Sequence, residues 1–260
     1  MKKCEKKVAI ITGATCGIGL AAARLFLSKG FKVYGIARRP YDGRDFKCFS
    51  ADVCDYDKID AILKEVFDTE GRLDVFVNNA GMGIAGAMED ATPQRIENIV
   101  NVNLTALCVL SGKAVKYLRH TKGRIINVSS MGGILPLPYQ AVYSATKSGA
   151  EIFSRALANE LKAYGLKVCA VLPNDTNTGF TDARICEGEN ATAKKSIEKM
   201  ARDERRGKSP EFVAKAIYKA ATKKRPPLRI SVGAVSKLET FLSRLFPVKL
   251  INFIIRKIYC

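Results

Sequence analysis

The amino-acid sequence predicts an α/β fold: one doubly wound parallel sheet with helices on both faces, plus an amphipathic helical extension at the C-terminus. Short β-branched runs alternate with longer helical patterns from Val8 to Leu172, and this order produces parallel strands. The β-branched runs are almost continuously apolar, as strands covered on both faces must be. A length of 260 residues, with 47% hydrophobic and 26% charged residues, suits one large folded domain.

The elements of the first part of the chain follow from residue period and composition. Strands are expected at Val8–Thr12, Lys32–Ala37, Val75–Asn78, Gly123–Ser129 and Lys167–Leu172, with a further strand just before Asp52. Helices are expected at Gly17–Lys29, Tyr56–Asp68, Thr92–Leu118 and Tyr143–Tyr164. The only histidine, His120, falls at an expected helix end, where a cation suits the helix dipole, so its predicted role is structural.

The composition of the chain changes beyond Pro173. Residues 178–209 are polar and contain helix formers but little apolar stripe, and such segments in compact domains are usually loops or lids. A helical period resumes at Pro210 and is expected to end at Pro226-Pro227. Residues 228–233 are predicted to form the last strand.

The last segment, 236–260, is predicted to form two basic amphipathic helices after a main domain of residues 1–235. One helical face carries apolar residues in two successive sets, Leu238, Phe241, Leu242, Leu245 and Phe246, then Ile251, Ile254, Ile255 and Ile258. Pro247 suits the first turn of the second helix.

The formal net charge is +18, and the excess is concentrated from Thr222 to Cys260, where nine Lys/Arg are opposed only by Glu239. An apolar face with Lys/Arg flanks can lie in a membrane interface, so peripheral membrane contact is one hypothesis. Alternatively the face packs over a cleft of the main domain or against a second subunit, or the charge simply keeps the surface soluble. No basic–aromatic interleaving accompanies the charge, so no nucleic-acid partner is predicted.

The eight cysteines form no C-x-x-C pair and no Cys/His cluster, which predicts free thiols and no metal site. No secretory apolar core follows the basic MKKCEKK start, and no stretch looks long and apolar enough to span a bilayer. We therefore expect a cytoplasmic protein, with possible membrane contact limited to the tail.

A glycine-rich turn, Thr12-Gly13-x-x-x-Gly17-x-Gly19, joins the first expected strand to the first expected helix. Glycines there let the backbone approach a pyrophosphate at the helix N-terminus, which predicts dinucleotide binding. The next strand ends in Ala37 and is followed by Arg38-Arg39. Guanidinium groups bind a 2′-phosphate, whereas a carboxylate there would repel it, so the predicted cofactor is NADP(H).

Tyr143-x-x-x-Lys147 puts two side chains on one helical face. An ammonium near a phenol is expected to lower the pKa of the phenol and make the pair a proton-transfer device. Ser130 follows the strand ending at Val128, at the sheet edge where ligands bind, and its hydroxyl can hold a substrate oxygen.

Together these residues resemble the short-chain dehydrogenase/reductase family over roughly residues 6–180. The motifs occur in the family's order: Thr12–Gly19, then Asn78-Asn79-Ala80-Gly81, Asn103 in NVNLT, Ser130, and Tyr143 with Lys147. The resemblance implies a Rossmann-type catalytic domain over 1–235 with a substrate lid at 178–209. It also implies a homo-oligomer, a dimer or a tetramer.

The resemblance implies a role for each matching residue. Tyr143 would transfer the proton, Lys147 would lower its pKa and bind the nicotinamide ribose, Ser130 would hold the substrate oxygen, and Asn103 would keep a water relay. The implied cofactor residues are Thr12, Gly13, Thr15, Cys16, Gly17, Ile18, Gly19, Arg38, Arg39, Asp52, Val53, Asn79, Ala80, Gly81, Tyr143, Lys147, Pro173, Asn174, Thr176 and Thr178. The chain departs from the family at Asn174, where Gly is usual, and Asn is expected to keep the turn by adopting a positive φ.

The function that follows is an NADP(H)-dependent transfer of hydride between the nicotinamide and a ketone or secondary alcohol. A hydrophobic substrate, steroid-like or long-chain, is expected. The alternatives are reduction of a 3-ketosphinganine or 3-oxoacyl group, and a non-catalytic NADP-binding sensor. Ile134, Leu135, Leu137 and Tyr139 either form an apolar substrate wall or pack within their own loop.

Overall fold

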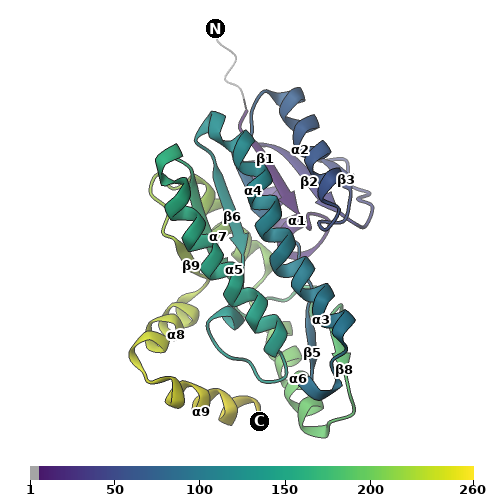
Figure 1. Cartoon of the computed structure of the whole chain (residues 1–260), viewed down its shortest axis with the longest axis vertical. Coiled ribbons are helices and arrows are strands. Elements are labelled where there is room, and N and C mark those ends of the chain that lie inside the picture. The colour runs from purple at the N-terminus through teal and green to yellow at the C-terminus, as the bar shows by residue number, and fades with distance from the viewer. Residues whose placement is uncertain (1–5) are drawn as a thin grey trace.

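The computed structural model describes residues 6–260, and its centre is a parallel sheet with the strand order β3-β2-β1-β4-β6-β7-β9 (Figure 1). Every neighbouring pair in it is parallel. The strands are β1 (Val8–Thr12), β2 (Lys32–Ala37), β3 (Lys47–Ser50), β4 (Val75–Asn78), β6 (Arg124–Val128), β7 (Lys167–Leu172) and β9 (Arg229–Ser231). The strand order reverses between β1 and β4, so the predicted doubly wound α/β fold is confirmed, and ligands bind at such a switch point.

Helices cover both faces of this sheet. On one face α1 (Gly17–Ser28) packs against α7 (Pro210–Thr222), with Phe26 and Ile217 fully buried between helices and strands. On the other face lie α2 (Tyr56–Glu70), α4 (Ala106–Leu118) and α5 (Ala141–Glu160), which bury a second core that includes Leu63 and Leu110. The chain thus has one hydrophobic core on each side of the sheet, as the uniformly apolar strands require.

The helix expected over Thr92–Leu118 is interrupted, which corrects that prediction. It consists of α3 (Pro93–Val100), a π-helical turn at Asn101–Thr105 and α4. The combined run Pro93–Thr121 is also long and apolar enough to cross a membrane by length and composition, contrary to expectation. Its hydropathy has another physical cause, because Ile99, Leu110 and Leu118 are buried inside the folded domain.

The segment 178–209 contains regular structure that its polar sequence did not predict. α6 (Ala191–Arg205) begins at Asn190, whose side chain accepts hydrogen bonds from the backbone N–H groups of Thr192 and Ala193. The helix is anchored by buried Met200, whose sulfur accepts a hydrogen bond from Gln140 just before α5. A small sheet of β5 (Ile84–Gly86) and β8 (Ile185–Glu187) connects the first part of this segment to the chain after β4.

Short helices and the chain ends complete the fold. The short helices are η1 (Met88–Asp90), η3 (Arg119–Thr121), η4 (Met131–Gly133) and η5 (Leu161–Tyr164). The tail forms α8 (Ala234–Leu245) and α9 (Val248–Tyr259), and Pro247 precedes the second helix directly. α7 ends at Thr222, before the prolines expected to stop it. His120 lies in η3 with its ring 5.0 Å from that of Phe67, in keeping with a structural role.

The cysteines of the described part of the chain are free thiols. Cys4 and the rest of the basic start, residues 1–5, lie outside the described residues. Within residues 6–260 no group of three His, Cys, Asp or Glu side chains could hold a metal ion.

Candidate active site

The glycine-rich turn between β1 and α1 leaves a cradle that side chains would fill. Gly13 and Gly17 have φ values of +66° and +52°, in the left-handed region that glycine tolerates best. A Cβ on Gly19 would lie 2.1 Å from the carbonyl oxygen of Gly13. Cys16 precedes the helix without a side-chain cap, so the first N–H groups of α1 are available to an anion. A dinucleotide pyrophosphate fits this arrangement.

The Asn-Asn-Ala-Gly segment after β4 holds that turn in place. The Thr12 hydroxyl accepts hydrogen bonds from the backbone N–H groups of Asn79 (2.9 Å) and Ala80 (3.0 Å). The Asn79 amide in turn donates to the Thr12 carbonyl oxygen at 2.9 Å. Two of the predicted cofactor segments therefore form one hydrogen-bonded unit, with Thr15 and Ile18 in the adjoining turn and first helical turn.

The two arginines lie at the carboxyl end of β2, beside the glycine turn. The Gly13 N–H donates to the Ile36 carbonyl oxygen at 2.7 Å, which brings the two segments together. Arg38 and Arg39 are exposed, and a guanidinium nitrogen of Arg38 lies 3.8 Å from a carboxylate oxygen of Asp52. Val53 next to it is buried. Arg38 can therefore reach a ligand phosphate at little cost, because an exposed ion pair at this distance is weak.

Ser130 follows β6 and is held against the start of α5. The Ser129 hydroxyl donates to the Lys147 carbonyl oxygen at 2.7 Å. A Cβ on Gly133 would lie 2.8 Å from that same carbonyl oxygen, so the loop and the helix are in close contact. The Ser130 hydroxyl accepts a hydrogen bond from the Gly132 N–H at 3.1 Å, and it lies close enough to the Tyr143 phenol to oppose the rise in the pKa of that phenol.

The protonation of the Tyr143–Lys147 pair differs from the expectation. Burial raises the pKa of Tyr143, and this exceeds the lowering by the Ser130 hydrogen bond. Burial also lowers the pKa of Lys147 to about 8. The Lys147 Nζ donates to the Val128 carbonyl oxygen at 3.1 Å and lies 5.8 Å from the centre of the Tyr143 ring. The predicted lowering of the tyrosine pKa by the ammonium is thus not seen, because desolvation dominates at both groups.

Asn103 lies inside the π-helical turn, fully buried. Its amide oxygen accepts from the Met82 N–H at 2.8 Å, and its amide nitrogen donates to the Met82 carbonyl oxygen at 2.9 Å. A Cβ on Gly81 would be 3.2 Å from the Asn103 oxygen and 3.4 Å from the Lys147 Nζ. Asn103, Gly81 and Lys147 therefore meet, although they come from three different segments.

The segment after β7 forms one side of the site, but Asn174 in it does not adopt the expected positive φ. Pro173 is buried, and its carbonyl oxygen accepts from the Met131 N–H at 2.8 Å. In the described chain a positive φ outside glycine occurs only at Lys122 and Tyr139, so Asn174 does not use one. The Thr176 hydroxyl instead donates to the Asn174 carbonyl oxygen at 2.7 Å. A Cβ on Gly17 would lie 3.4 Å from the Thr178 side chain, so this segment lies beside the glycine turn.

The structure adds residues that the sequence did not single out. Phe180 lies with its ring 6.1 Å from that of Tyr143. Arg184 is buried and paired with Glu204, while its Nε and Nη1 atoms have no partner in the described chain. Asp175 has its pKa raised to about 6 by burial and by neighbouring carboxylates. Their surroundings in sequence are merely polar, so no local signal could have identified them.

A buried polar network supports the floor of the site. The Asn78 amide nitrogen donates at 2.9 Å to the Ser111 hydroxyl and to the Asn127 amide oxygen. The Asn127 nitrogen donates to the Ser154 hydroxyl at 2.9 Å. These bonds connect β4 and β6 to α4 and α5, so the strands that end at the site are fixed relative to the helices that supply it.

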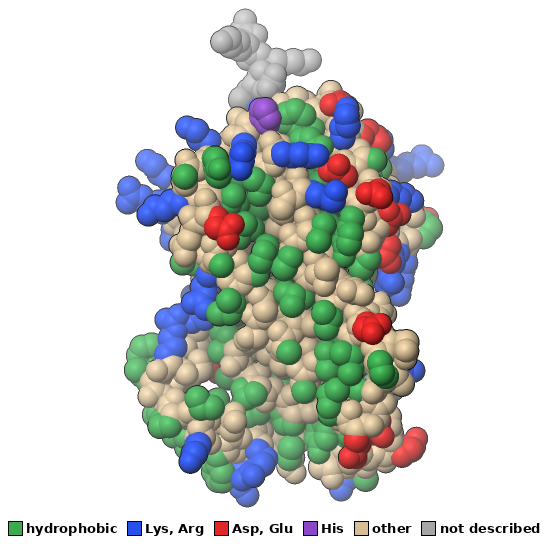
Figure 2. All heavy atoms as spheres, in the orientation of Figure 1, with side chains coloured by type: hydrophobic (Ala, Val, Ile, Leu, Met, Phe, Trp, Pro, Cys, Tyr) green, Lys and Arg blue, Asp and Glu red, His purple; other side chains and the backbone are tan. Residues whose placement is uncertain are grey.

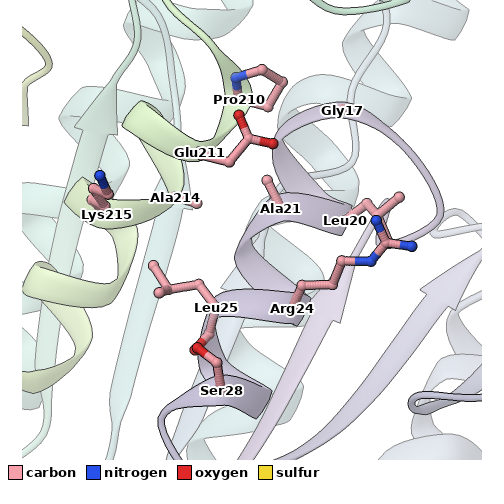
Figure 3. Close-up of a pocket in the computed structure, with 10 residues that line it drawn as sticks. All are labelled: Gly17, Leu20, Ala21, Arg24, Leu25, Ser28, Pro210, Glu211, Ala214 and Lys215. Atoms are coloured by element: carbon pink, nitrogen blue, oxygen red, sulfur yellow. The ribbon is translucent and has the colours of Figure 1, made fainter.

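Two hollows lie near the site but do not contain its reactive groups. Figure 3 shows a groove between α1 and α7, lined by Ala21, Leu25 and Ala214 and reaching Gly17 at one end. A second hollow is lined mainly by apolar residues around β5 and η1 and at the start of α5, among them Ile84 and Val142. Ile134 and Leu135 pack on Met131 and neighbouring core residues, the loop-packing alternative left open by the sequence.

A parallel sheet with a glycine cradle at its switch point, and a serine–tyrosine pair at the neighbouring strand end, defines an oxidoreductase that uses a nicotinamide cofactor. The family model described as short chain dehydrogenase matches residues 7–187. The chain belongs to the short-chain dehydrogenase family, whose members act on CH–OH groups.

Individual relatives are similar over most of their length. The chain is 37% identical to a 3-ketodihydrosphingosine reductase of Bacteroides thetaiotaomicron, over 88% of each chain. It is 34% identical to a 3-oxoacyl-[acyl-carrier-protein] reductase of Vibrio cholerae, over 72% of this chain and 81% of that one. A short-chain dehydrogenase from Streptomyces avermitilis matches the structure with a TM-score of 0.84 at 28% identity, covering 99% of this chain and 98% of its own.

Proposed function

We propose that this protein uses NADPH to reduce a ketone on a long hydrophobic substrate, a 3-keto long-chain base in the first instance. The observation that carries the proposal is the Tyr143 hydroxyl, which lies beside Ser130 and whose pKa is raised by burial. A tyrosine that stays protonated at neutral pH is the proton donor that ketone reduction consumes. Oxidation would instead need the phenolate, which this environment disfavours.

The proposed reaction is balanced by the groups present. The glycine turn and Lys147 would hold a reduced nicotinamide cofactor, which when bound would supply the hydride for the carbonyl carbon. The Tyr143 hydroxyl gives its proton to the carbonyl oxygen, and the Ser130 hydroxyl donates a hydrogen bond to that oxygen as negative charge develops. Lys147, with a pKa of about 8, is largely protonated at neutral pH and stabilises the tyrosinate left behind. Asn103 holds the segment around Met82 and Gly81 beside that ammonium.

The proposed preference for NADPH rests on Arg38 and Arg39. Both follow β2 at the sheet edge where the adenosine ribose of a dinucleotide lies, and both are exposed. A 2′-phosphate would compete with Asp52 for Arg38, and it carries more charge than the single carboxylate.

The proposed substrate class rests on similarity and on the surroundings of Tyr143. The relative that is 37% identical is named for 3-ketodihydrosphingosine, a long-chain ketone, which favours long-chain over steroid-like substrates. Phe180 beside Tyr143 and the apolar hollow around Ile84 suit a hydrocarbon chain. A 3-oxoacyl substrate is the second candidate, supported by the Vibrio cholerae relative. A homo-oligomer in the cytoplasm, with residues 178–209 as the substrate lid, belongs to the same proposal.

The test follows the absorbance of the reduced nicotinamide with 3-ketodihydrosphingosine, a 3-oxoacyl thioester and a steroid ketone. Turnover of the long-chain base with NADPH is expected, and Tyr143→Phe should abolish it while leaving cofactor binding intact. Tyr164→Phe, at an exposed tyrosine in η5, the short helix that follows α5, is the matched control. Tight NADPH binding without turnover of any ketone would favour the sensor alternative, and undiminished turnover by Tyr143→Phe would refute the assigned proton donor.

A further inference from the structure

In α8 the large apolar side chains face solvent and the small polar ones face the domain, the reverse of an amphipathic helix that packs on a core. Its side toward the domain carries small hydroxyl residues, with Ser236 and Thr240 buried. Its large apolar residues point outward, and Leu238, Phe241 and Leu245 are 57%, 57% and 61% exposed. Such a face is a contiguous apolar stripe in water, which soluble surfaces normally avoid unless a partner covers it.

The next helix, α9, continues this arrangement. Ile255 faces the domain and is buried, while Leu250, Ile254 and Ile258 are exposed at a spacing of four residues. The single apolar face predicted for this segment is therefore divided, because Ile255 turns inward and Ile254 outward. The outer apolar face, as we call it, consists of Leu238, Phe241, Leu245, Leu250, Ile254 and Ile258. Figure 2 shows hydrophobic side chains among Lys and Arg over this part of the surface.

The charge around the outer apolar face has one sign. Lys237 and Arg244 accompany α8, and Lys249, Arg256 and Lys257 accompany α9. The only acidic residue in either helix, Glu239, is half-buried and its pKa is raised by burial. Two copies of this face would bring like charges together, which opposes self-association through it. An anionic lipid surface neutralises the same charges and covers the apolar side chains.

Both ends of the tail are fixed to segments that form the active site. The Thr240 hydroxyl is hydrogen-bonded at 2.7 Å to Ser231 of β9 and contacts the Met131 sulfur, next to Ser130. At the far end the Lys199 ammonium of α6 lies 6.0 Å from the centre of the Tyr259 ring, and Cys260 lies close enough to Tyr139 to raise the pKa of its phenol. Figure 1 shows α8 and α9 leaving the sheet near β9 and reaching across to α6.

We propose that the outer apolar face of α8 and α9 docks the protein on an anionic lipid bilayer, beside the entrance to the active site. The biological role of docking rests on the proposed function, because docking would bring a membrane-borne long-chain ketone to Tyr143. Docking is a property of the folded chain and is measured with no cofactor or ketone present.

The experiment is co-sedimentation of the full chain with vesicles at low salt. Strong binding to vesicles containing phosphatidylglycerol and weak binding to pure phosphatidylcholine are expected. Changing Lys249, Arg256 and Lys257 together to Glu should weaken binding by about a hundredfold or more, since three basic contacts are lost. The matched control changes Lys223, Lys224 and Arg225 to Glu, which removes the same charge near the amino ends of β6 and β7, and it should retain most binding.

A second variant separates a bilayer from a second copy. Leu238→Ser, Phe241→Ser and Leu245→Ser together should abolish vesicle binding without changing the sedimentation mass, because these exposed side chains contribute little to folding. The proposal is overturned if the unmodified chain does not bind anionic vesicles, or if both charge variants weaken binding equally. It is also overturned if the apolar variant dissociates an oligomer and still binds vesicles. Each of these failures would leave ketone turnover in solution untouched, so it is distinguishable from failure of the reductase proposal.

Discussion

Replacing Gly19 by alanine should damage the cofactor cradle through a single methyl group. The added Cβ would lie 2.1 Å from the Gly13 carbonyl oxygen and 2.6 Å from the Asn79 amide nitrogen, both of which are held by neighbouring hydrogen bonds. Overpacking of this kind costs about 1–3 kcal/mol. Alanine recovers about 0.5–1 kcal/mol inside a helix, so the net free energy of unfolding should fall by about 1 kcal/mol, taking the middle of each range.

The matched control is Gly112→Ala in α4, where a Cβ would meet nothing within 4 Å. This change should raise the free energy of unfolding by about 0.5–1 kcal/mol, opposite in sign to Gly19→Ala. Urea unfolding measures both, and quenching of intrinsic fluorescence by NADPH measures cofactor binding. A distorted cradle should weaken binding about tenfold or more in Gly19→Ala alone, tenfold being about 1.4 kcal/mol. Unchanged NADPH affinity in Gly19→Ala would show that the close approach of these backbones is not what the cofactor requires.

Three further predictions follow from charges in and around the site. The folded-state pKa of Lys147 lies below its unfolded value of 10.5, so burial of the ammonium costs stability below pH 8, and this cost is relieved as pH rises from about 8 to 10.5. Between pH 8 and 10.5 the unfolding free energy should therefore rise by about 3 kcal/mol more in the unmodified protein than in Lys147→Met. The control Lys162→Met, at an exposed site, should show the same pH dependence as the unmodified protein. The pKa of Asp175 is raised from 3.8 to about 6, so the unmodified protein should lose stability relative to Asp175→Asn as the pH rises from 3.8 to about 6. Parallel curves of unfolding free energy against pH for the two proteins would contradict this. Changing Arg38 and Arg39 together to Glu should weaken NADPH binding about tenfold or more while sparing NADH, as titration of each cofactor would measure, and equal losses for the two would argue against recognition of the 2′-phosphate.

Most of the fold could be predicted because its signals are local. Val8–Thr12, Lys32–Ala37 and Val75–Asn78 are strands with the predicted bounds, since a short apolar β-branched run has few other stable conformations. The glycines of the turn and the four-residue spacing of Tyr143 and Lys147 are requirements of backbone geometry, and they are visible without any tertiary contact. The set of candidate site residues could thus be named in advance, although their roles remain predictions.

Other features depended on contacts between distant segments. The π-helical turn at Asn103 accompanies the bonds of that side chain to Met82, and nothing in NVNLT distinguishes it from ordinary helix. α6 is held by Met200 against the start of α5, a contact that its polar sequence conceals.

Local pattern also established that the tail is amphipathic and basic, because period and composition are properties of neighbouring residues. The direction in which its faces point depended on long-range packing, since Thr240 contacts Ser231 of β9 and Met131, and Ser236 is buried beside it, while the larger side chains are exposed. The protonation of Tyr143 followed the same logic: spacing brings Lys147 onto its face of the helix, but the pKa is governed by how much water the folded chain removes. Desolvation and packing are sums over many distant residues, so they become defined only when the chain has folded.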